Sequence, residues 1–266
     1  MSPLVIRSLG AAFDLVGTAP KTVCELSLAE IRRLPVRQGN RDASLGDLCD
    51  VSGDPRSMRW RLEGDWSRVT GVGAGMAAGE IVVAGAVGRH AGEGMTGGML
   101  AIDGDAGDWL GAEMRGGIVR VAGNAGDHVG GALAGSRRGM AGGAILVAGN
   151  VGDFAGERMR RGLVAVGGDT GDWLACGMHA GTVIVWGACG AHLAAEMIRG
   201  TVAALGPTPS LGATFRAGST AVWPMLPLLR RELESLGFAK TLPLDPLQIV
   251  HGDFLRGGRG EVLLAA

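Results

Sequence analysis

A short glycine-punctuated motif recurs seven times between Gly64 and Gly206, and this repeat limits the folds open to the chain more than any other feature. Four of the six intervals between successive units are 19 residues long, while the other two, of 21 and 26 residues, contain insertions. A fixed period near 20 residues is typical of solenoids, in which each unit packs only against its neighbours. The units begin at Gly64, Gly85, Gly104, Gly123, Gly149, Gly168 and Gly187.

Each unit ends in a short run with apolar, mostly β-branched residues at alternate positions. Such a run suits a strand with one face against a core. Units stacked at the inter-strand spacing of about 4.8 Å would form a prism on the order of 30 Å long. The sequence therefore predicts an all-β fold, a single-stranded parallel β-helix of about seven turns. The alternating pairs are Ile81/Val83, Leu100/Ile102, Val119/Val121, Ile145/Val147, Val164/Val166, Val183/Val185 and Val202/Ala204.

Two further columns of the repeat hold one residue type throughout. A glycine precedes every strand, which indicates a corner with positive φ or with no room for a Cβ. A methionine stands three residues before that glycine in every unit, and we interpret it as adaptable core filler. The glycines are Gly79, Gly98, Gly117, Gly143, Gly162, Gly181 and Gly200; the methionines are Met76, Met95, Met114, Met140, Met159, Met178 and Met197.

An aromatic and imidazole column follows the lead glycines. Its histidines lie two or three turns apart, roughly 10 to 14 Å, whereas zinc ligands lie about 2 Å from the metal. We therefore expect a packed ladder along one edge and no metal site. The column reads His90, Trp109, His128, Phe154, Trp173 and His192.

Short polar residues occupy the turns of the repeat. Those that follow the lead glycine are expected to bond their own backbone in Asx-turns. A second column, of aspartates, is expected at exposed turns, because like charges on adjacent turns repel. The first column is Asp65, Asp105, Asn124, Asn150 and Asp169; the second is Asp108, Asp127, Asp153 and Asp172.

The middle residue of each strand should face away from the interior. Six of these seven residues are apolar, so we expect this face to be covered by the chain's own ends or by another protein. They are Val82, Ala101, Arg120, Leu146, Ala165, Ile184 and Ala203.

Composition narrows the class of protein and its partners. With 25 basic and 26 acidic residues, the chain has no charge excess that would favour nucleic acid or a membrane surface. The four cysteines, Cys24, Cys49, Cys176 and Cys189, have no metal-binding spacing and are expected to be buried thiols. The sequence carries neither a secretory leader pattern nor a long apolar run, which favours a cytoplasmic location.

The flanking segments carry no repeat and divide the chain into three parts. Residues 1–60 are expected to form an N-terminal cap that contacts a partner, residues 61–206 the repeat domain, and residues 207–266 a C-terminal cap. In the first part, Leu4–Ile6 suggests a strand and Ser27–Glu30 a capping box that starts a helix. The glycine-rich dipeptides between residues 39 and 54 are interpreted as loops.

The last part contains one amphipathic pattern, from Pro224 to Leu236, which predicts a helix with proline in its first turn. Glu261–Leu264 predicts a final strand. Within the repeat domain, the longer fourth unit holds Ala134–Gly139, which we expect to protrude as a loop.

No motif for nucleophilic catalysis, phosphate binding or metalloproteolysis occurs in the chain. The one candidate site is basic, because arginines of units three to five should gather on one side of the stack. Guanidinium groups favour carboxylates in bidentate pairs. A solvated or salt-bridged surface is the alternative interpretation. These arginines are Arg115, Arg137, Arg138, Arg158, Arg160 and Arg161.

The repeat, as in Gly104–Gly117, is similar to the right-handed β-helix shared by the C-terminal domain of the glutamate synthase large subunit and the C subunit of formylmethanofuran dehydrogenase. Gly39-Asn40 and Leu45–Leu48 before the array, with His251–Asp253 and Gly260–Leu264 after it, resemble the free-standing C subunit. The resemblance covers nearly the whole chain.

This resemblance implies a structural subunit in which other subunits carry the chemistry. Two complexes use such a subunit: a molybdenum or tungsten formylmethanofuran dehydrogenase, and a bacterial formyltransferase/hydrolase complex. In the latter, a formyl group passes from tetrahydromethanopterin to a methanofuran-type carrier and is released as formate. The arginine-rich composition favours the bacterial complex. Expected partners are formyltransferase and hydrolase or dehydrogenase subunits.

The resemblance also bears on ligands. It implies no cofactor bound by this chain alone, with zinc or molybdenum and tungsten only in partner subunits, and a carrier with a glutamate-rich tail. We therefore hypothesise that Arg137, Arg138, Arg160 and Arg161 hold that tail or the formyltransferase subunit. Two other classes stay open: an autonomous β-helix enzyme such as an acyltransferase, and a ligand-binding solenoid.

Overall fold

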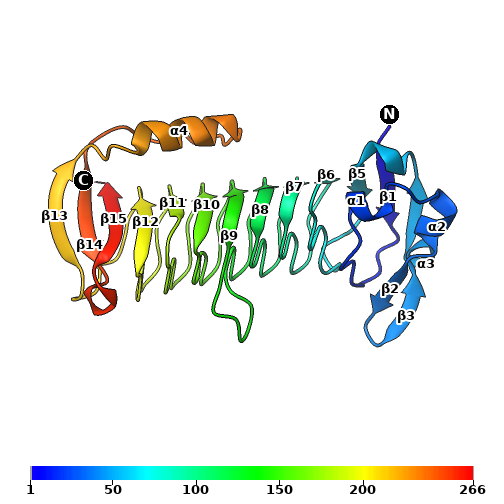
Figure 1. Ribbon diagram of the computed structural model, residues 1–266, viewed down its shortest axis with the longest axis horizontal. Coiled ribbons are helices and arrows are strands. Elements are labelled where there is room, and N and C mark those ends of the chain that lie inside the picture. Colours follow the sequence, from blue (N-terminus) through cyan, green and yellow to red (C-terminus); the bar gives the residue numbers. More distant parts are fainter. Residues whose placement is uncertain (1, 266) are drawn as a thin grey trace.

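The computed structural model describes residues 2–265 and has most of its regular structure in β-strands. Figure 1 shows the strands side by side along the long axis, with the N-terminal segment at one end and the last strands at the other. Thirteen strands form one sheet, in the order β13-β14-β15-β12-β11-β10-β9-β8-β7-β6-β5-β1-β4, while β2 and β3 form a separate pair. The all-β class predicted from the sequence is confirmed.

The repeat units supply the central strands of this sheet, and each strand pairs in parallel with that of the next unit. Equivalent residues lie side by side, as Ile81, Leu100 and Val119 do. A second line of parallel bridges joins the units, for example between Val87 and Ala106, so the units stack in register. The strands are β6 (Glu80–Val83), β7 (Thr96–Ile102), β8 (Arg115–Val121), β9 (Ala141–Val147), β10 (Arg161–Val166), β11 (Thr182–Val185) and β12 (Arg199–Ala204).

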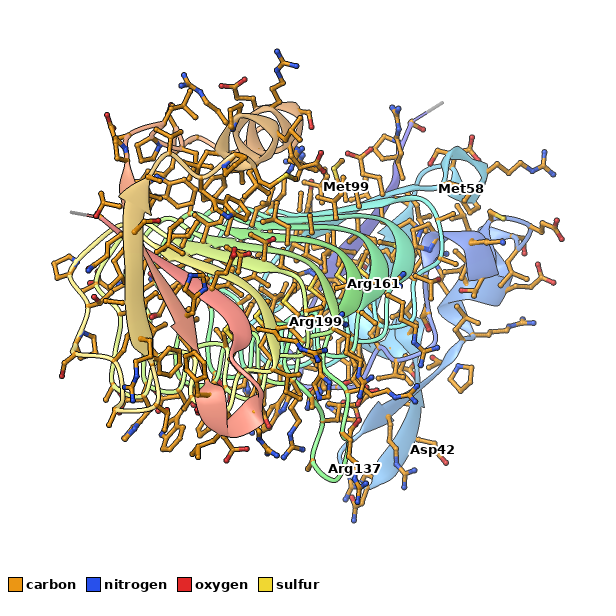
Figure 2. All side chains as sticks on the ribbon, turned by 60° about the vertical axis from the view of Figure 1, so that its left-hand side comes forward. Asp42, Met58, Met99, Arg137, Arg161 and Arg199 are labelled. Atoms are coloured by element: carbon orange, nitrogen blue, oxygen red, sulfur yellow. The ribbon has the colours of Figure 1, made fainter. Side chains whose placement is uncertain are left out.

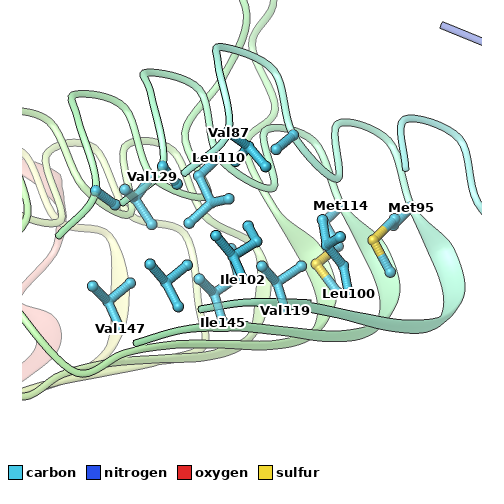
Figure 3. Close-up of a cluster of buried hydrophobic side chains, with 14 of the residues drawn as sticks. Val87, Met95, Leu100, Ile102, Leu110, Met114, Val119, Val129, Ile145 and Val147 are labelled. Atoms are coloured by element: carbon cyan, nitrogen blue, oxygen red, sulfur yellow. The ribbon is translucent and has the colours of Figure 1, made fainter. Parts of the chain in front are cut away.

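The core runs through the middle of the stack as rows of aliphatic side chains. Leu100, Val119 and Ile145 form one such row, and Met95 and Met114 lie next to it (Figure 3). All seven methionines of the repeat have a relative exposure of 0%. The interpretation of this column as core filler is therefore confirmed, and unbranched methionine suits the uneven space near the corners.

The glycine column of the repeat adopts φ angles between 81° and 110°, which side chains rarely allow. Gly79 and Gly181 directly precede their strands as predicted, whereas the other five glycines are the second or third residue of theirs. A Cβ at Gly117 would lie 2.8 Å from the carbonyl oxygen of Gly98, and a Cβ at Gly162 would lie 2.8 Å from that of Gly143. The chain turns its corner against the backbone of the preceding unit, so no space for a side chain exists there.

The polar turn residues bond differently from the expectation in all but the first unit. Asp65 accepts the N–H of Ser67 in its own turn, as predicted. The Asx-turn prediction is wrong for the other four, because each side chain accepts an N–H from the next unit; Asp105 Oδ1, for example, lies 2.7 Å from the amide nitrogen of Asn124.

The aspartate column behaves in the same way. Asp127 Oδ1 accepts the N–H of Asp153 at 2.8 Å, and the other three aspartates make the equivalent bond. A backbone donor therefore lies beside each carboxylate, which offsets the repulsion between like charges on adjacent turns.

The segment before the repeats extends the sheet by three strands. Residues expected as loops between 39 and 54 instead include β3, α3 and β4, because their polar residues face solvent beside buried Leu45 and Val51. The Leu4–Ile6 strand and the Ser27–Glu30 capping box are confirmed. The elements are β1 (Leu4–Ser8), α1 (Pro20–Val23), α2 (Leu28–Arg32), β2 (Pro35–Gln38), β3 (Arg41–Ser44), α3 (Leu45–Leu48), β4 (Cys49–Ser52), η1 (Pro55–Ser57) and β5 (Arg59–Glu63).

The segment after the repeats folds back onto the stack. Its last strand pairs in parallel with β12, so it continues the repeat ladder, and two antiparallel strands complete that end. The predicted final strand is confirmed, and so is the helix, although it begins at Leu226 and has Pro227, not Pro224, in its first turn. The elements are β13 (Arg216–Ala221), α4 (Leu226–Ser235), β14 (Leu247–Gly252), η2 (Phe254–Arg256) and β15 (Arg259–Ala265).

Helix α4 lies across the outward face of the strands (Figure 1). Leu226 and Leu233 of the helix belong to one buried cluster with the outward residues Leu146, Ala165 and Ile184. The expectation that the chain's own end covers this face is thus confirmed for the later units. Figure 1 shows no helix of residues 2–265 over β6, so the cover is partial.

The single charged residue of the outward column has a structural explanation. The Arg120 guanidinium lies beside Gly237, just after the end of α4, where the partial negative charge of a helix C-terminus favours a cation. None of the helices in the described part of the chain has the length and apolar character needed to span a lipid bilayer.

Candidate functional site

Basic side chains gather along one edge of the stack, next to the methionine column. The residue after each methionine donates its N–H to the methionine carbonyl of the preceding unit, as Arg160 does to Met140 at 2.7 Å and His179 to Met159 at 2.8 Å. This ladder places Arg160 and His179 on neighbouring units. We use the term basic edge for Arg137, Arg158, Arg160, Arg161, His179, Arg199 and Arg256.

A pocket of about 350 Å³ opens on the basic edge. Its arginines come from three distant parts of the chain, namely the loop of the fourth unit, the fifth unit and the 3₁₀ turn η2. The loop protrudes as predicted, and Figure 2 places Arg137 on it, with Arg161 and Arg199 on the strand side. The lining residues are Gly135, Ser136, Arg137, Arg158, Gly177, His179, Glu196, Ile198 and Arg256.

Two of the pocket arginines are held by hydrogen bonds and ion pairs. Arg158 donates to the carbonyl oxygen of Ser136 at 2.8 Å and pairs with Glu157 at 3.4 Å, which ties the loop to the fifth unit. Arg256 pairs with Glu196 at 2.5 Å across the pocket wall.

The turn that carries Arg256 is fixed to the stack by a buried carboxylate. Asp253 accepts the N–H of Glu196 at 3.1 Å and that of Leu255 at 3.0 Å. Its residue exposure is only 5%, so these charge-assisted bonds are made away from water. Asp253 thereby sets the position of the C-terminal wall of the pocket.

The arginines create a positive potential at His179. Burial first, and then the charges of Arg160, Arg256, Arg158 and Arg199, lower the pKa of this imidazole from its usual 6.5. The positive potential of these four arginines, which opposes protonation of His179, also favours an anion at this position. The Nε of Arg160 is buried and has no hydrogen-bond partner among residues 2–265, so the folded chain leaves this guanidinium incompletely satisfied.

The structure distributes the four arginines of the sequence hypothesis unevenly. Arg137 lines the pocket, and Arg160 lies close enough to lower the pKa of His179. Arg161 begins β10 and is exposed on the same edge, whereas Arg138 is exposed on the loop but does not line the pocket. Arg115, also named from the sequence, begins β8 and is exposed.

Sequence reasoning missed three residues of the basic edge, His179, Arg199 and Arg256, and the pocket residue Glu196. His179, Glu196 and Arg199 stand one or two positions from a repeat methionine, so the column that identifies Arg160 and Arg161 could also have identified them. Arg256 lies outside the repeat, and no pattern in the sequence places it here.

The aromatic column forms a separate edge. Successive rings from His90 to His192 stack with centroids 4.1 to 6.0 Å apart and interplanar angles of at most 18°. His90 contacts Glu93 at 2.6 Å and His128 contacts Glu157 at 3.3 Å. The predicted ladder is confirmed, and residues 2–265 contain no group of three or more His, Cys, Asp or Glu side chains that could hold a metal ion.

The cysteines are the remaining reactive groups. The expectation of burial holds for Cys49 and Cys189, whereas Cys24 and Cys176 are half-buried at the edges of the core. Burial raises the pKa of Cys49 to about 12 and that of Cys176 to about 11, and it also raises the pKa of Cys189. Thiols of this kind stay protonated near neutral pH and are poor nucleophiles.

Comparison with known proteins gives partial sequence matches and a structural match over nearly the full chain. No protein-family model matches. The C subunit of the molybdenum-containing formylmethanofuran dehydrogenase 1 of Methanothermobacter thermautotrophicus is 40% identical over 68 residues, which are 25% of this chain and 17% of that protein. The C subunit of the tungsten-containing formylmethanofuran dehydrogenase 2 of the same organism is 37% identical over 77 residues, 27% of this chain and 28% of that protein. Each match therefore spans less than a third of the relative.

The structural match is more extensive. A chain in the crystal structure of the formyltransferase/hydrolase complex from Methylorubrum extorquens, in complex with methylofuran, superposes with a TM-score of 0.91 and 35% sequence identity. The superposition covers 98% of this chain and 99% of that chain.

Proposed function

This chain belongs to the family of formylmethanofuran dehydrogenase C subunits, and from that premise we propose that it is a non-catalytic structural subunit of a cytoplasmic formyltransferase/hydrolase complex. The observation that carries the proposal is the match over 98% of the chain to a component of such a complex. The partners are then the formyltransferase and hydrolase subunits. The complex as a whole converts formyl-tetrahydromethanopterin to formate through a methanofuran-type carrier.

The architecture that suits this role is a right-handed single-stranded parallel β-helix of about seven turns over residues 61–206. The in-register parallel strands and the second line of bridges support it. Residues 1–60 and 207–266 would act as caps, although β5 spans the boundary at residue 60 and β15 adds a further parallel strand at the other end. A stack of this kind offers a long, stiff side to other subunits.

A structural role agrees with the chemistry of the side chains. The thiols with raised pKa are weak nucleophiles, and the paired imidazoles of the aromatic column face glutamates. The basic edge provides positive potential, which binds and orients an anion. Zinc or molybdenum and tungsten chemistry would be supplied by partner subunits.

Within this role, the basic edge would hold the anionic tail of the carrier or the adjoining formyltransferase subunit. Arg137, which lines the pocket, and Arg160, whose charge acts on His179, are the strongest contributors, with Arg161 on the strand side and Arg138 on the loop. A tail rich in carboxylates fits guanidinium groups in bidentate geometry. The structural neighbour, which is in complex with methylofuran, supports a role near the carrier.

A second candidate is the C subunit of a molybdenum- or tungsten-containing formylmethanofuran dehydrogenase. The identities of 40% and 37% to such subunits favour it, but these matches cover about a quarter of the chain. The near-complete structural match favours the hydrolase complex.

Purification of the native complex through an affinity tag on this chain tests the proposal. We expect formyltransferase and hydrolase subunits in fixed ratio; a protein that elutes without them, or with a molybdenum or tungsten subunit, would overturn it. The double substitution of Arg160 and Arg161 by Ser should lower the amount of carrier retained. Arg231→Ser, an exposed change on α4, serves as the matched control, and equal retention in both variants would refute the role of the basic edge.

A further inference from the structure

The two ends of the 13-stranded sheet are finished differently. At the N-terminal end, the outermost strand is β4, and one of its faces is buried. The guanidinium of Arg32, from α2, donates to the carbonyl oxygen of Val51 in β4 at 2.7 Å. A side chain and a helix therefore protect this edge, which is how monomeric sheets avoid pairing with other chains.

At the other end, the outermost strand is β13, and it is open. Five of its six residues are exposed and Ala221 is half-buried. Figure 1 places β13 at the extreme of the stack, and Figure 2 shows the strand at the front with no other element of the described chain across it. Both faces of the strand and its outer row of backbone N–H and C=O groups are thus accessible.

The side chains of β13 do not guard this edge. After Arg216 the strand reads Ala-Gly-Ser-Thr-Ala, with no charge and no proline. The Arg216 guanidinium folds back onto the carbonyl oxygens of Ala213 and Phe215 at 2.9 and 3.3 Å. Lysine, proline and inward charges are the usual barriers against edge pairing, and β13 carries none of these.

A groove runs beside the open strand. It has a volume of about 370 Å³ and lies between the loop that follows the repeats and the end strands. Its wall combines apolar residues with Thr208, Ser210 and Gln248, so small or apolar side chains of an added strand would lie against its apolar part. The lining includes Pro209, Leu211, Phe215, Ala217, Val250 and Leu264.

Just beyond the strand, the surface is apolar as well. Val222 and Met225, which connect β13 to α4, are 49% and 45% exposed. An added strand at β13 would therefore lie next to exposed apolar side chains.

We propose that an extended segment of another subunit of the complex pairs with β13 as an added strand. Backbone hydrogen bonds to the open edge would provide affinity, and alternate small or apolar side chains of the segment would enter the groove beside Ala217. The small side chains of β13 let the partner lie close to the strand. The pairing slips between Ala217 and Thr220 within β13 and β14, so the partner would bond on one side of that irregularity or on both.

The identity of the partner as a subunit of the complex rests on the proposed function, whereas the pairing itself rests on the geometry of β13. Hydrogen-deuterium exchange of the tagged complex and of the isolated full-length chain separates the two. We expect amides of residues 216–221 to exchange at least about tenfold more slowly in the complex, since each hydrogen bond formed hinders opening. Strand β15, paired on both sides, is the internal control and should be protected in both states.

Substitution of the open strand provides the second arm. The double change Ala217→Lys and Thr220→Lys introduces edge lysines at exposed positions, and it should reduce recovery of the other subunits by about tenfold or more. Ser235→Lys on α4 is the matched control and should leave recovery unchanged. Thermal unfolding of the isolated variants shows whether they remain folded.

Three outcomes overturn the inference. Complex that forms normally while residues 216–221 exchange at the same rate as in the isolated chain excludes pairing at β13. Full recovery of the other subunits with the double lysine variant also excludes pairing at β13. A dimer of the isolated chain that the lysines abolish assigns the edge to a second copy of this chain. Absence of any co-purified subunit instead refutes the proposed function.

Discussion

The corner glycines allow a sharp test, because the chain contains a natural control four residues away. Gly98 has φ 81°, and a Cβ there would lie 2.7 Å from the carbonyl oxygen of Gly79 and 3.1 Å from the Met76 methyl carbon. Gly94 has φ 61°, and a Cβ there would meet nothing within 4 Å. Glu113, the equivalent of Gly94 in the third unit, adopts φ 53° with a full side chain.

The expected magnitudes follow from these two environments. At Gly98, alanine adds backbone strain of about 1–3 kcal/mol and a collision that costs roughly 1–3 kcal/mol, together about 4 kcal/mol. At Gly94, alanine also adopts a positive φ, as Glu113 does in the third unit, and this costs about 1–2 kcal/mol, but no collision is added. The collision, and not the mere loss of a glycine, produces the difference.

Thermal unfolding of the isolated chain, followed by the circular dichroism of its strands, measures the effect. At roughly 2–4 °C per kcal/mol for a chain of this size, Gly98→Ala should lower the midpoint by on the order of 10 °C and Gly94→Ala by about 5 °C or less. Equal shifts for the two variants would show that the close approach of successive units at the corner does not limit the residue there.

Three further predictions concern the turn ladder, the covering helix and the basic edge. Asp127→Ala should destabilise the chain by about 1–2 kcal/mol in urea unfolding, because the amide of Asp153 loses its acceptor. Asp127→Asn keeps an oxygen at that position and should cost less. The reverse order of the two variants would contradict the hydrogen bonds between successive turns. Leu233 is 1% exposed, so Leu233→Ala should lower the free energy of unfolding by about 2–4 kcal/mol and speed proteolysis of α4. Leu228 is 56% exposed, so Leu228→Ala should be nearly neutral. Equal effects of the two variants would contradict the packing of α4 on the strands. Because the folded chain lowers the pKa of His179 below 6.5, the unfolded chain binds the proton more readily, so the contribution of His179 to stability is fully present above pH 6.5 and is lost as pH falls through the folded pKa. His179→Gln should therefore reduce the slope of unfolding free energy against pH in this acidic range. An unchanged slope would contradict the prediction.

The repeat made most of the fold predictable. A column of seven glycines, a column of seven methionines and alternating aliphatic residues each report the same environment seven times, so position in the unit reveals burial. Met114 and Val119 were assigned to the core in this way, and both have 0% exposure. The aromatic ladder was predictable for the same reason, since a column of rings at one rung spacing must stack.

The hydrogen-bond partners of the turn side chains were harder to predict from the sequence. Asp105 has two donors within reach, the N–H groups of its own turn and the N–H of Asn124 one unit later, and sequence spacing does not reveal which is closer. Parallel stacking decides the matter, because it brings the amide of the next unit directly beside the carboxylate. This register is a property of the assembled stack.

The basic edge was only partly predictable. Arg160 and Arg161 could be placed by their column, but Arg256 reaches the pocket because the buried carboxylate of Asp253 fixes its turn to the last unit. Such a contact joins residues 57 positions apart outside any periodic pattern. The segment 41–52 was misassigned for a related reason, since β3 forms by pairing with β2 and β4 forms by pairing with β1 and packing against α2.

The insertion in the fourth unit leaves the aromatic ladder undisturbed, with centroids 5.0 Å apart on either side of His128. Additional residues thus bulge sideways without lengthening the rod, and its end-to-end reach changes only by whole rungs of about 4.8 Å. Any two proteins bound at different positions along the stack would therefore be held at a separation set by the number of repeat units between them.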